Sequence, residues 1–523
     1  MDPLALGSRP LRLEDLVAVA RGGRLVRLDP SARERLARSR KVVDRALAEG
    51  RVVYGITTGF GRFSDVALPS GQARALQRNL VLSHATGVGP PFARDVVRGM
   101  LLLRANALVQ GFSGVRPEVV ETLVEMLNRK VHPVVPEQGS LGASGDLAPL
   151  AHLMLVAIGE GWAEGPGGPV PGAEAMAGAG LRPLVLEAKE GLALINGTQA
   201  MTARLGLALH EARAVLEAAT VAACLSLEAL RGVVDAFDAR VVGVRAHPGQ
   251  AEVAARVREL VRGSRYVTRG GELRVQDAYS LRCVPQVHGA VADALAWAAA
   301  VVEAEMNAAT DNPLVFPEGE EGEGEVLSGG NFHGEPVAFA GDLAGIAVAE
   351  LASISERRTS RLVDAALSGG LPPFLTRQGG LHSGFMLVQY TAAALVSENK
   401  VLASPASVDS IPSSAGQEDH VSMGTIAARK AGAVVRNTAR VVACELLSAC
   451  QAIDLRGGLM GVAEPGSDPE RLAEPLGEGT RRHYLRVREM SPFVTDDRPL
   501  AQDIERLAEA VLGGEFPWCV RPA

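Results

Sequence analysis

The chain has 523 residues, which is long enough to bury a large core and to form more than one structural region. Hydrophobic residues make up 47% of it and charged residues 22%, a balance that excludes an intrinsically disordered protein. The formal net charge of −7 gives no general attraction to nucleic acid or to an anionic membrane. A nucleic-acid-binding protein is therefore disfavoured.

The cysteines and the apolar runs indicate in which cellular compartment the protein is expected. The five cysteines are scattered and show no C-x-x-C spacing, which argues against a disulfide framework and a structural zinc site. The first residues carry an early acid, Asp2, and lack the apolar core of a signal peptide. The apolar run 287–306 is interrupted by Asp293 and Glu303, so no uncharged stretch reaches the ~18 residues of a membrane span. We expect a cytoplasmic protein without contact to a membrane.

Composition and periodicity predict a mainly α fold. Aromatic residues are only 4% of the chain, while alanine and leucine are plentiful, which favours packed helices over a β-sandwich. A one-sided apolar stripe follows Pro117 and must end near residue 130, because two prolines lie within 131–136. Longer helical patterns cover residues 199–231, 288–308, 336–367 and 426–452.

Glycine and proline divide the chain. Residues 159–183 are rich in both and predict an exposed excursion, whereas the acidic run 317–326 predicts a surface hairpin. A further stretch, 456–478, separates the helical patterns from the C-terminal region. We therefore predict an N-terminal region at 1–195, a long central helical bundle at 196–455 and a C-terminal helical region at 456–523.

The segment 137–152, EQGSLGASGDLAPLAH, holds the most informative pattern. Four small residues at 142–145 run into an apolar helix that begins near Asp146. Taken alone, a serine and an aspartate before an apolar run favour an ordinary helix N-cap. A phosphate-binding loop does not fit because no lysine follows, and a hydrolase elbow does not fit because Ser144 lacks the G-x-S-x-G frame.

The same residues also suit an internal cyclisation. If the amide nitrogen of Gly145 attacks the carbonyl carbon of Ala143, a ring closes, and loss of water from the ring and from Ser144 leaves an electrophilic methylene. Glycine permits the close approach, alanine is small, and the serine hydroxyl is the group that leaves. Asp146 is placed to move protons. A built-in electrophile would explain an enzyme that needs no external cofactor, because ordinary side chains supply only nucleophiles, acids and bases.

GSLGASGDLAPLAH resembles the signature of the aromatic amino-acid ammonia-lyases, whose Ala-Ser-Gly triplet becomes 4-methylidene-imidazol-5-one (MIO). The resemblance extends from YGITTGFG at 54–61 to QEDHVSMG at 417–424. It implies an MIO formed from Ala143, Ser144 and Gly145, which lie in the N-terminal region. It also implies a long helical bundle and a homotetramer whose active sites are shared between subunits.

The pair Ser83-His84 lies where this family selects its substrate. In members that use tyrosine the corresponding pair resembles His-Leu, and in members that use phenylalanine it resembles Phe-Leu. The Ser-His pair of this chain resembles the pair of the members that use histidine. The resemblance therefore implies non-oxidative deamination of L-histidine to trans-urocanate and ammonia, the first step of histidine degradation. A tyrosine or phenylalanine ammonia-lyase, or an MIO aminomutase, is the alternative.

The motifs of the family imply the other site residues. They are the catalytic Tyr54, Tyr279 and Glu418 and the substrate-binding Asn196, Gln276, Arg282 and Phe332. Arg282 is expected to clamp the α-carboxylate, since a guanidinium offers it two parallel hydrogen bonds. Either Tyr54 or Glu418 is expected to remove the β-proton. Addition of the substrate's amino group to the electrophile and attack by its aromatic ring both remain open.

Several of these residues have plainer interpretations. Asn196 is suited to cap the helix that begins near residue 198, and Arg282 to form a surface ion pair with Asp277. The string 418–420, Glu-Asp-His, suggests a metal only weakly, because adjacent residues on a helix point apart, and we expect none. Gly416 departs from the family, which has asparagine there.

Two other classes of protein compete with this interpretation. The fumarase/aspartase-type helical lyases carry a G-S-S-x-M-P-x-K-x-N loop that this chain lacks. A non-catalytic helical scaffold needs no Ala-Ser-Gly triplet. An intact mass separates the scaffold from the enzyme, because MIO formation removes two water molecules.

Overall fold

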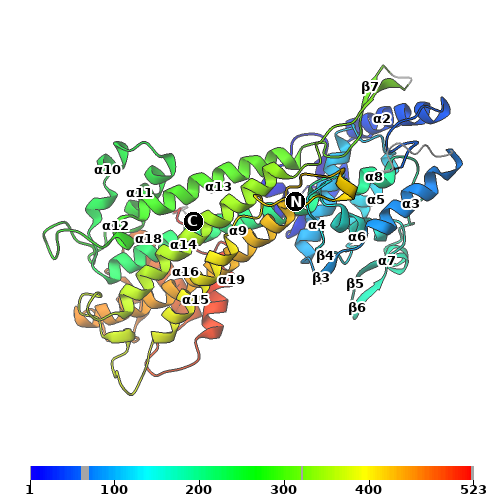
Figure 1. The fold of residues 1–523 in the computed structure, drawn as a ribbon. Helices are drawn as coiled ribbons and strands as arrows, with labels where there is room; N and C mark the ends of the chain where they lie inside the picture. Colours follow the sequence, from blue (N-terminus) through cyan, green and yellow to red (C-terminus); the bar gives the residue numbers. More distant parts are fainter. Residues whose placement is uncertain (1, 60–69, 320–321, 520–523) are drawn as a thin grey trace. The chain divides into compact units, whose positions relative to one another are not determined.

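The computed structural model describes residues 2–59, 70–319 and 322–519 (Figure 1). Helices dominate this part of the chain, so the expectation of a mainly α fold is confirmed. The chain forms two compact units, each assembled from separate stretches of sequence. The first comprises Met1–Leu207, Ala298–Asp342 and Pro405–Arg429, and the second Ala208–Trp297, Leu343–Ser404 and Lys430–Ala523. The division into three continuous regions stays a prediction.

Among the described residues, eight shorter helices belong to the first unit. They are α1 (Leu13–Ala20), α2 (Pro30–Ala48), α3 (Ala73–His84), α4 (Arg94–Val109), α5 (Pro117–Asn128), α6 (Leu147–Ala157), α7 (Gly172–Gly178) and α8 (Glu190–Ile195). Proline opens α5 because its fixed φ suits the first turn of a helix, and α5 ends close to the predicted place. In α4 every residue from Val96 to Val109 is buried, so this helix forms the core of the unit.

Strands are short and pair two by two within the described residues. They are β1 (Leu4–Leu6) with β2 (Val26–Leu28), β3 (Val88–Pro91) with β4 (Pro136–Gln138), β5 (Trp162–Gly165) with β6 (Gly168–Pro171), and β7 (Leu314–Glu318) with β8 (Glu323–Leu327). The β1–β2 pair is parallel and the other three are antiparallel. The β7–β8 hairpin confirms the hairpin predicted at 317–326.

The stretch 159–183 is more ordered than its glycines and prolines suggested. It contains the β5–β6 hairpin and α7, and it buries Ala163 and Met176 completely. Two small apolar anchors therefore hold this stretch to the unit, although most of its residues face solvent.

Four long helices contribute residues to both units. They are α9 (Gln199–Ala229), α13 (Val284–Met306), α14 (Glu335–Val363) and α16 (Gly424–Leu459), and they confirm the four long patterns found in the sequence (Figure 1). Their ends differ from the predicted ones: α13 begins earlier, and α16 continues past residue 452.

The second unit holds the larger part of these helices together with α10 (Ala239–Gly243), α11 (Pro248–Leu260), α12 (Tyr279–Arg282), α15 (Met386–Leu402), α17 (Pro469–Ala473), α18 (Glu478–Met490) and α19 (Ala501–Leu512). A buried ion pair ties three of the long helices together. Arg358 of α14 donates to both oxygens of Glu445 of α16, at 2.6 and 2.8 Å. Ser226 of α9 donates to the same carboxylate, at 2.7 Å. Both charges are fully buried, so each needs the other.

Two of the long helices, α13 and α14, are long and apolar enough to cross a membrane by length and composition. The sequence analysis expected no membrane span because no uncharged stretch is long enough. Helices α13 and α14 are nevertheless apolar enough on average, because one or two charged residues lower the mean hydropathy only a little. Only 33% of the most apolar window of α13 is buried, against 61% for α14. Core helices of soluble proteins have the same length and composition, so the result is weak evidence for a membrane.

Candidate active site

The small-residue loop before α6 turns back on itself. Gly142 and Gly145 face each other as an antiparallel bridge pair, with Ala143 and Ser144 at the turn between them. Gly145 has a φ of +72°, and a Cβ on it would lie 2.2 Å from the carbonyl oxygen of Gly197. No side chain fits at this position, so glycine is required both by the left-handed backbone and by the close approach of Gly197. The two ends of the turn are thus held close together around Ala143 and Ser144.

Ser144 joins two of the predicted site residues. Its hydroxyl donates a hydrogen bond of 2.7 Å to Oε1 of Glu418. Its carbonyl oxygen accepts a hydrogen bond of 2.8 Å from the side-chain amide of Asn196. The other oxygen of Glu418 accepts from the hydroxyl of Ser413, at 2.8 Å. The structure therefore brings the triplet, Asn196 and Glu418 together from three distant segments.

Asp146 occupies the N-cap position of α6, but its side chain bonds to other segments. One oxygen accepts from the hydroxyls of Ser140, at 3.0 Å, and Thr425, while the other accepts from the backbone N–H of Met201, at 2.8 Å. Burial raises the pKa of this carboxyl, and these hydrogen bonds oppose the rise. Asp146 thus holds three segments around the triplet. It is the N-cap of α6 by position, as the sequence predicted, but its side chain makes no capping hydrogen bond.

Arg104 is a residue that the sequence analysis missed. Fully buried in α4, it donates from Nη1 to the carbonyl oxygen of Asn196 and to Oε1 of Gln199, both at 2.8 Å. Burial lowers its pKa to about 10. The sequence does contain one indication of a buried functional cation, because Arg104 lies inside the apolar run MLLLRANALV. Since the side chain of Asn196 points to Ser144, its predicted role as a cap for α9 is not what the structure shows.

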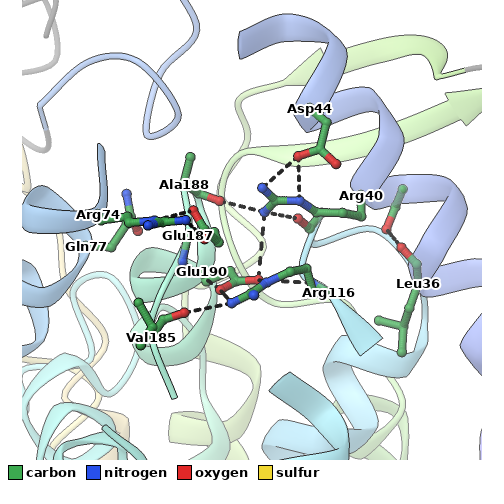
Figure 2. Close-up of polar contacts among 12 residues, drawn as sticks. Leu36, Arg40, Asp44, Arg74, Gln77, Arg116, Val185, Glu187, Ala188 and Glu190 are labelled. Carbon is green, nitrogen blue, oxygen red and sulfur yellow. Dashed lines mark hydrogen bonds and ion pairs between the residues drawn. The ribbon is translucent and has the colours of Figure 1, made fainter. Parts of the chain in front are cut away.

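The position of Asn196 depends on α8, which ends immediately before it. Figure 2 shows the polar cluster at the start of that helix. Arg116 binds both oxygens of the fully buried Glu190, at 2.7 and 2.8 Å, and Arg40 donates to the carbonyl oxygen of Ala188, at 2.9 Å. These contacts fix α8 to α2 and to the residue before α5. The first helical turn of α8 is therefore anchored, and its last turn delivers Asn196.

His84 is the last residue of α3 and is half-buried. Its Nδ1 lies 3.1 Å from the hydroxyl of Ser83. Burial lowers the pKa of the imidazole, while the carboxylate of Glu418 acts in the opposite direction. Both residues belong to the first unit.

Two further predicted residues lie in the same unit. Tyr54 is half-buried in a turn over residues 54–57, and the end of its motif, 60–61, lies outside the described residues. Phe332 is half-buried just before α14. Their contacts to the triplet stay predictions.

The remaining three predicted residues form a cluster of their own in the second unit. Arg282 donates from Nη1 to Oε1 of Gln276, at 3.0 Å, and its guanidinium carbon lies 4.6 Å from the ring centre of Tyr279. Tyr279 is 70% exposed. The ion pair suggested between Arg282 and Asp277 is wrong, because Asp277 pairs with Arg274 at 2.9 Å. Nε of Arg282 is buried and makes no hydrogen bond within the described residues.

The segment around Glu418 is not the helix that the sequence analysis assumed, and its backbone explains the glycine at position 416. Residues 417–420 are not helical, and Glu418 pairs as an isolated bridge with Ser413. Gly416 has a φ of +83°. Asparagine tolerates this left-handed conformation better than most residues do, so the departure from the family pattern exchanges two residues that suit the same backbone.

Comparison with known proteins agrees with this geometry. The model of the aromatic amino acid lyase family matches residues 11–489. A histidine ammonia-lyase from Alkaliphilus metalliredigens is 55% identical over 511 residues, covering 98% of this chain and 97% of the relative. Another from Symbiobacterium thermophilum is 57% identical over 516 residues, covering 99% and 98%.

Solved structures give the same result. The crystal structure of histidine ammonia-lyase from Trypanosoma cruzi has a TM-score of 0.88 at 41% identity, covering 98% of this chain and 94% of that one. The tyrosine aminomutase from Streptomyces globisporus has a TM-score of 0.90 at 39% identity, covering 98% and 97%. The fold and the site thus define an enzyme of the lyase class. The chain belongs to the aromatic amino acid lyase family.

Proposed function

We propose that this enzyme removes ammonia from L-histidine without oxidation and releases trans-urocanate, as the first step of histidine degradation. The observation that carries the proposal is the hydrogen bond between Ser144 and Glu418, which puts a carboxylate against the triplet. The Ser83-His84 pair and the names of the curated relatives support histidine as the substrate.

We propose that Ala143, Ser144 and Gly145 form an MIO and that no external cofactor is used. The residues present fit this group, since the loop is already bridged from Gly142 to Gly145 and no Cβ obstructs the Gly145 nitrogen. When formed, the MIO supplies an electrophile that makes the substrate's amine a better leaving group. Asn196 would hold it through the amide that now binds Ser144.

The chain's own side chains orient the substrate and move its protons. Arg282 binds the α-carboxylate through two parallel hydrogen bonds, and Gln276 and Tyr279 support that guanidinium. His84, whose pKa is lowered by burial, is suited to contact the substrate ring as a neutral imidazole. Glu418 or Tyr54 accepts the β-proton. The β-carbon's C–H group is a weak acid, so removal of the proton depends on accurate positioning of the base and the substrate.

We propose a homotetramer in which subunits share active sites, as the resemblance to the family implies. The apolar surface of α13 supports self-association, since two-thirds of its most apolar window is unburied while Trp297 is 46% exposed. We place the enzyme in the cytoplasm, which is consistent with its five unpaired cysteines.

The test is a cofactor-free absorbance assay of the purified enzyme with L-histidine, L-tyrosine and L-phenylalanine, together with the intact mass of the chain. We expect turnover of histidine alone and a mass lower by two water molecules. The Ser144→Ala variant is the control and should lose both the turnover and the mass change.

Other outcomes separate the alternatives. Turnover of tyrosine or phenylalanine would show that Ser83-His84 does not select histidine. Formation of a β-amino acid would indicate an aminomutase. An unmodified mass with no turnover of any of the three amino acids would overturn the assignment of the triplet.

A further inference from the structure

Two histidines and a glutamate meet outside the set of residues used by the proposed reaction. His333 lies just before α14, Glu335 is the first residue of that helix, and His420 follows the Glu418 segment. Each offers one ligand atom, and the three atoms lie within 4.8 Å of one another. All three residues belong to the first unit.

The side chains of the cluster are arranged before any ligand binds. The rings of His333 and His420 are nearly parallel, with 5° between their planes and 5.7 Å between their centres. The Nδ1 atom of His333 accepts a long hydrogen bond of 3.4 Å from the backbone N–H of Glu335. This contact ties the imidazole to the first turn of α14, close to the carboxylate of the same turn.

One polar atom of the cluster lacks a partner. Oε2 of Glu335 is buried and makes no hydrogen bond within the part of the chain that the structure describes. A buried carboxylate oxygen without a donor is costly, so it calls for a cation or a hydrogen-bond donor. The neighbouring imidazoles can act as electron-pair donors, and together these groups match the requirements of a metal better than those of water.

We propose that His333, Glu335 and His420 bind a divalent transition-metal ion, with Zn²⁺ as the best match. Two imidazole nitrogens and one carboxylate oxygen are a ligand set that zinc accepts, with a fourth position left for water. Bonds of about 2.0–2.1 Å place tetrahedral ligands about 3.3 Å apart. The ligand atoms of the cluster lie up to 4.8 Å apart, and the exposed side chain of His420 has the freedom to move closer to the other two.

The site is separate from the proposed chemistry, although it lies beside it in the chain. Phe332 precedes His333, and Glu418 lies two residues before His420. The sequence showed no metal-ligand spacing because His333 and His420 are far apart along the chain and converge only in the fold. The inference does not depend on the identity of the amino-acid substrate.

The test measures metal binding directly. The purified full-length enzyme, treated with a chelator and dialysed, is titrated with Zn²⁺ by calorimetry and with Co²⁺ by visible absorption. We expect one ion per chain and, for Co²⁺, the intense visible bands of a tetrahedral site. In His420→Asn and in Glu335→Gln we expect binding to weaken by more than the ~10–100-fold that loss of an outer-shell partner costs.

His382→Asn is the matched control, because His382 also lies near a carboxylate, with its Nε2 3.3 Å from Asp496, and is not part of the cluster. It should bind Zn²⁺ like the parent. Since the side chain of His420 is exposed, His420→Asn should keep the parent's melting temperature without metal. Absence of binding up to about 1 mM Zn²⁺, far weaker than structural zinc sites, would overturn the proposal. Equal binding by the parent and both cluster variants would also overturn it.

Discussion

The hydroxyl of Ser144 and the carboxylate of Glu418 are joined by a hydrogen bond of 2.7 Å, although 274 positions separate the two residues along the chain. The hydroxyl is the group that leaves as water in the dehydration that follows the proposed cyclisation. The same carboxylate is also a candidate to take the β-proton of the substrate. One side chain is thus placed to serve both the maturation of the enzyme and its turnover.

Glu418→Gln should lower kcat for L-histidine by about 10²–10⁴-fold, the range for loss of a general base. Glutamine keeps the shape of the side chain and an oxygen for Ser144, but its amide does not accept a proton at neutral pH. Steady-state kinetics and an intact mass on the same sample check this. The mass separates an unmatured triplet from a matured enzyme that lacks its base.

Ser413→Ala is the control for this variant. It removes a hydrogen bond to the second oxygen of Glu418 but leaves the carboxylate in place. We expect a loss of only a few-fold, consistent with the ~1 kcal/mol of one hydrogen bond. A matured Glu418→Gln enzyme with a kcat within about threefold of the parent would rule out Glu418 and leave Tyr54 as the base.

Asp146→Asn should destabilise the first unit by about 1–3 kcal/mol. The carboxylate accepts hydrogen bonds on both oxygens, so replacing one oxygen by an amide turns a donor toward another donor. Urea unfolding measures the change. Thr425→Val removes a single donor to Asp146 and should cost less than Asp146→Asn does. Equal costs for the two variants would contradict the view that Asp146 is the centre of this network.

Two neighbouring glutamates offer a matched comparison of a buried and an exposed ion pair (Figure 2). Glu190 is fully buried against Arg116, so Glu190→Gln should cost about 3–5 kcal/mol by leaving that guanidinium without its counter-charge. Glu187 pairs with Arg74, which is 68% exposed, so Glu187→Gln should cost at most about 1 kcal/mol. Differential scanning calorimetry of both variants compares the two losses. Similar losses would show that burial does not decide the strength of this cluster.

The motifs of the sequence predicted the Ala-Ser-Gly triplet and two of its contacts, but they did not predict the side chains that support those contacts. Periodicity located the long helices because an apolar stripe is a local property of the chain. Motifs located Ser144, Asn196 and Glu418, which the structure brings into contact. The support from Arg104 to Asn196 was not predictable, because it depends on which buried carbonyl a cation in α4 meets in the folded state.

The errors of the sequence analysis have the same cause. Asp146 is an N-cap by position, yet its partners come from three segments whose proximity no local pattern records. The expectation that residues 418–420 point apart assumes a helix, but backbone pairing between Ser413 and Glu418 gives this segment a different conformation. The cluster of His333, Glu335 and His420 likewise exists only in three dimensions.

Acid should destabilise the enzyme through histidines that are neutral when buried. His132 is 7% exposed, and burial, assisted by Arg98, lowers its pKa to about 4. In the unfolded chain a histidine has a pKa near 6.5. Between about pH 6.5 and pH 4 the unfolded state therefore binds a proton that the folded state does not. By linkage the free energy of unfolding falls as the pH falls through this window.

His132→Gln isolates this contribution, because glutamine does not titrate. The comparison of variant and parent is needed since Glu228, whose pKa burial raises to about 7, acts in the opposite direction as the pH falls. Between about pH 7 and pH 5 the parent should lose about 2 kcal/mol more stability than the variant does. Urea unfolding at the two pH values measures it, and a difference between parent and variant that does not change with pH would contradict the assignment to His132.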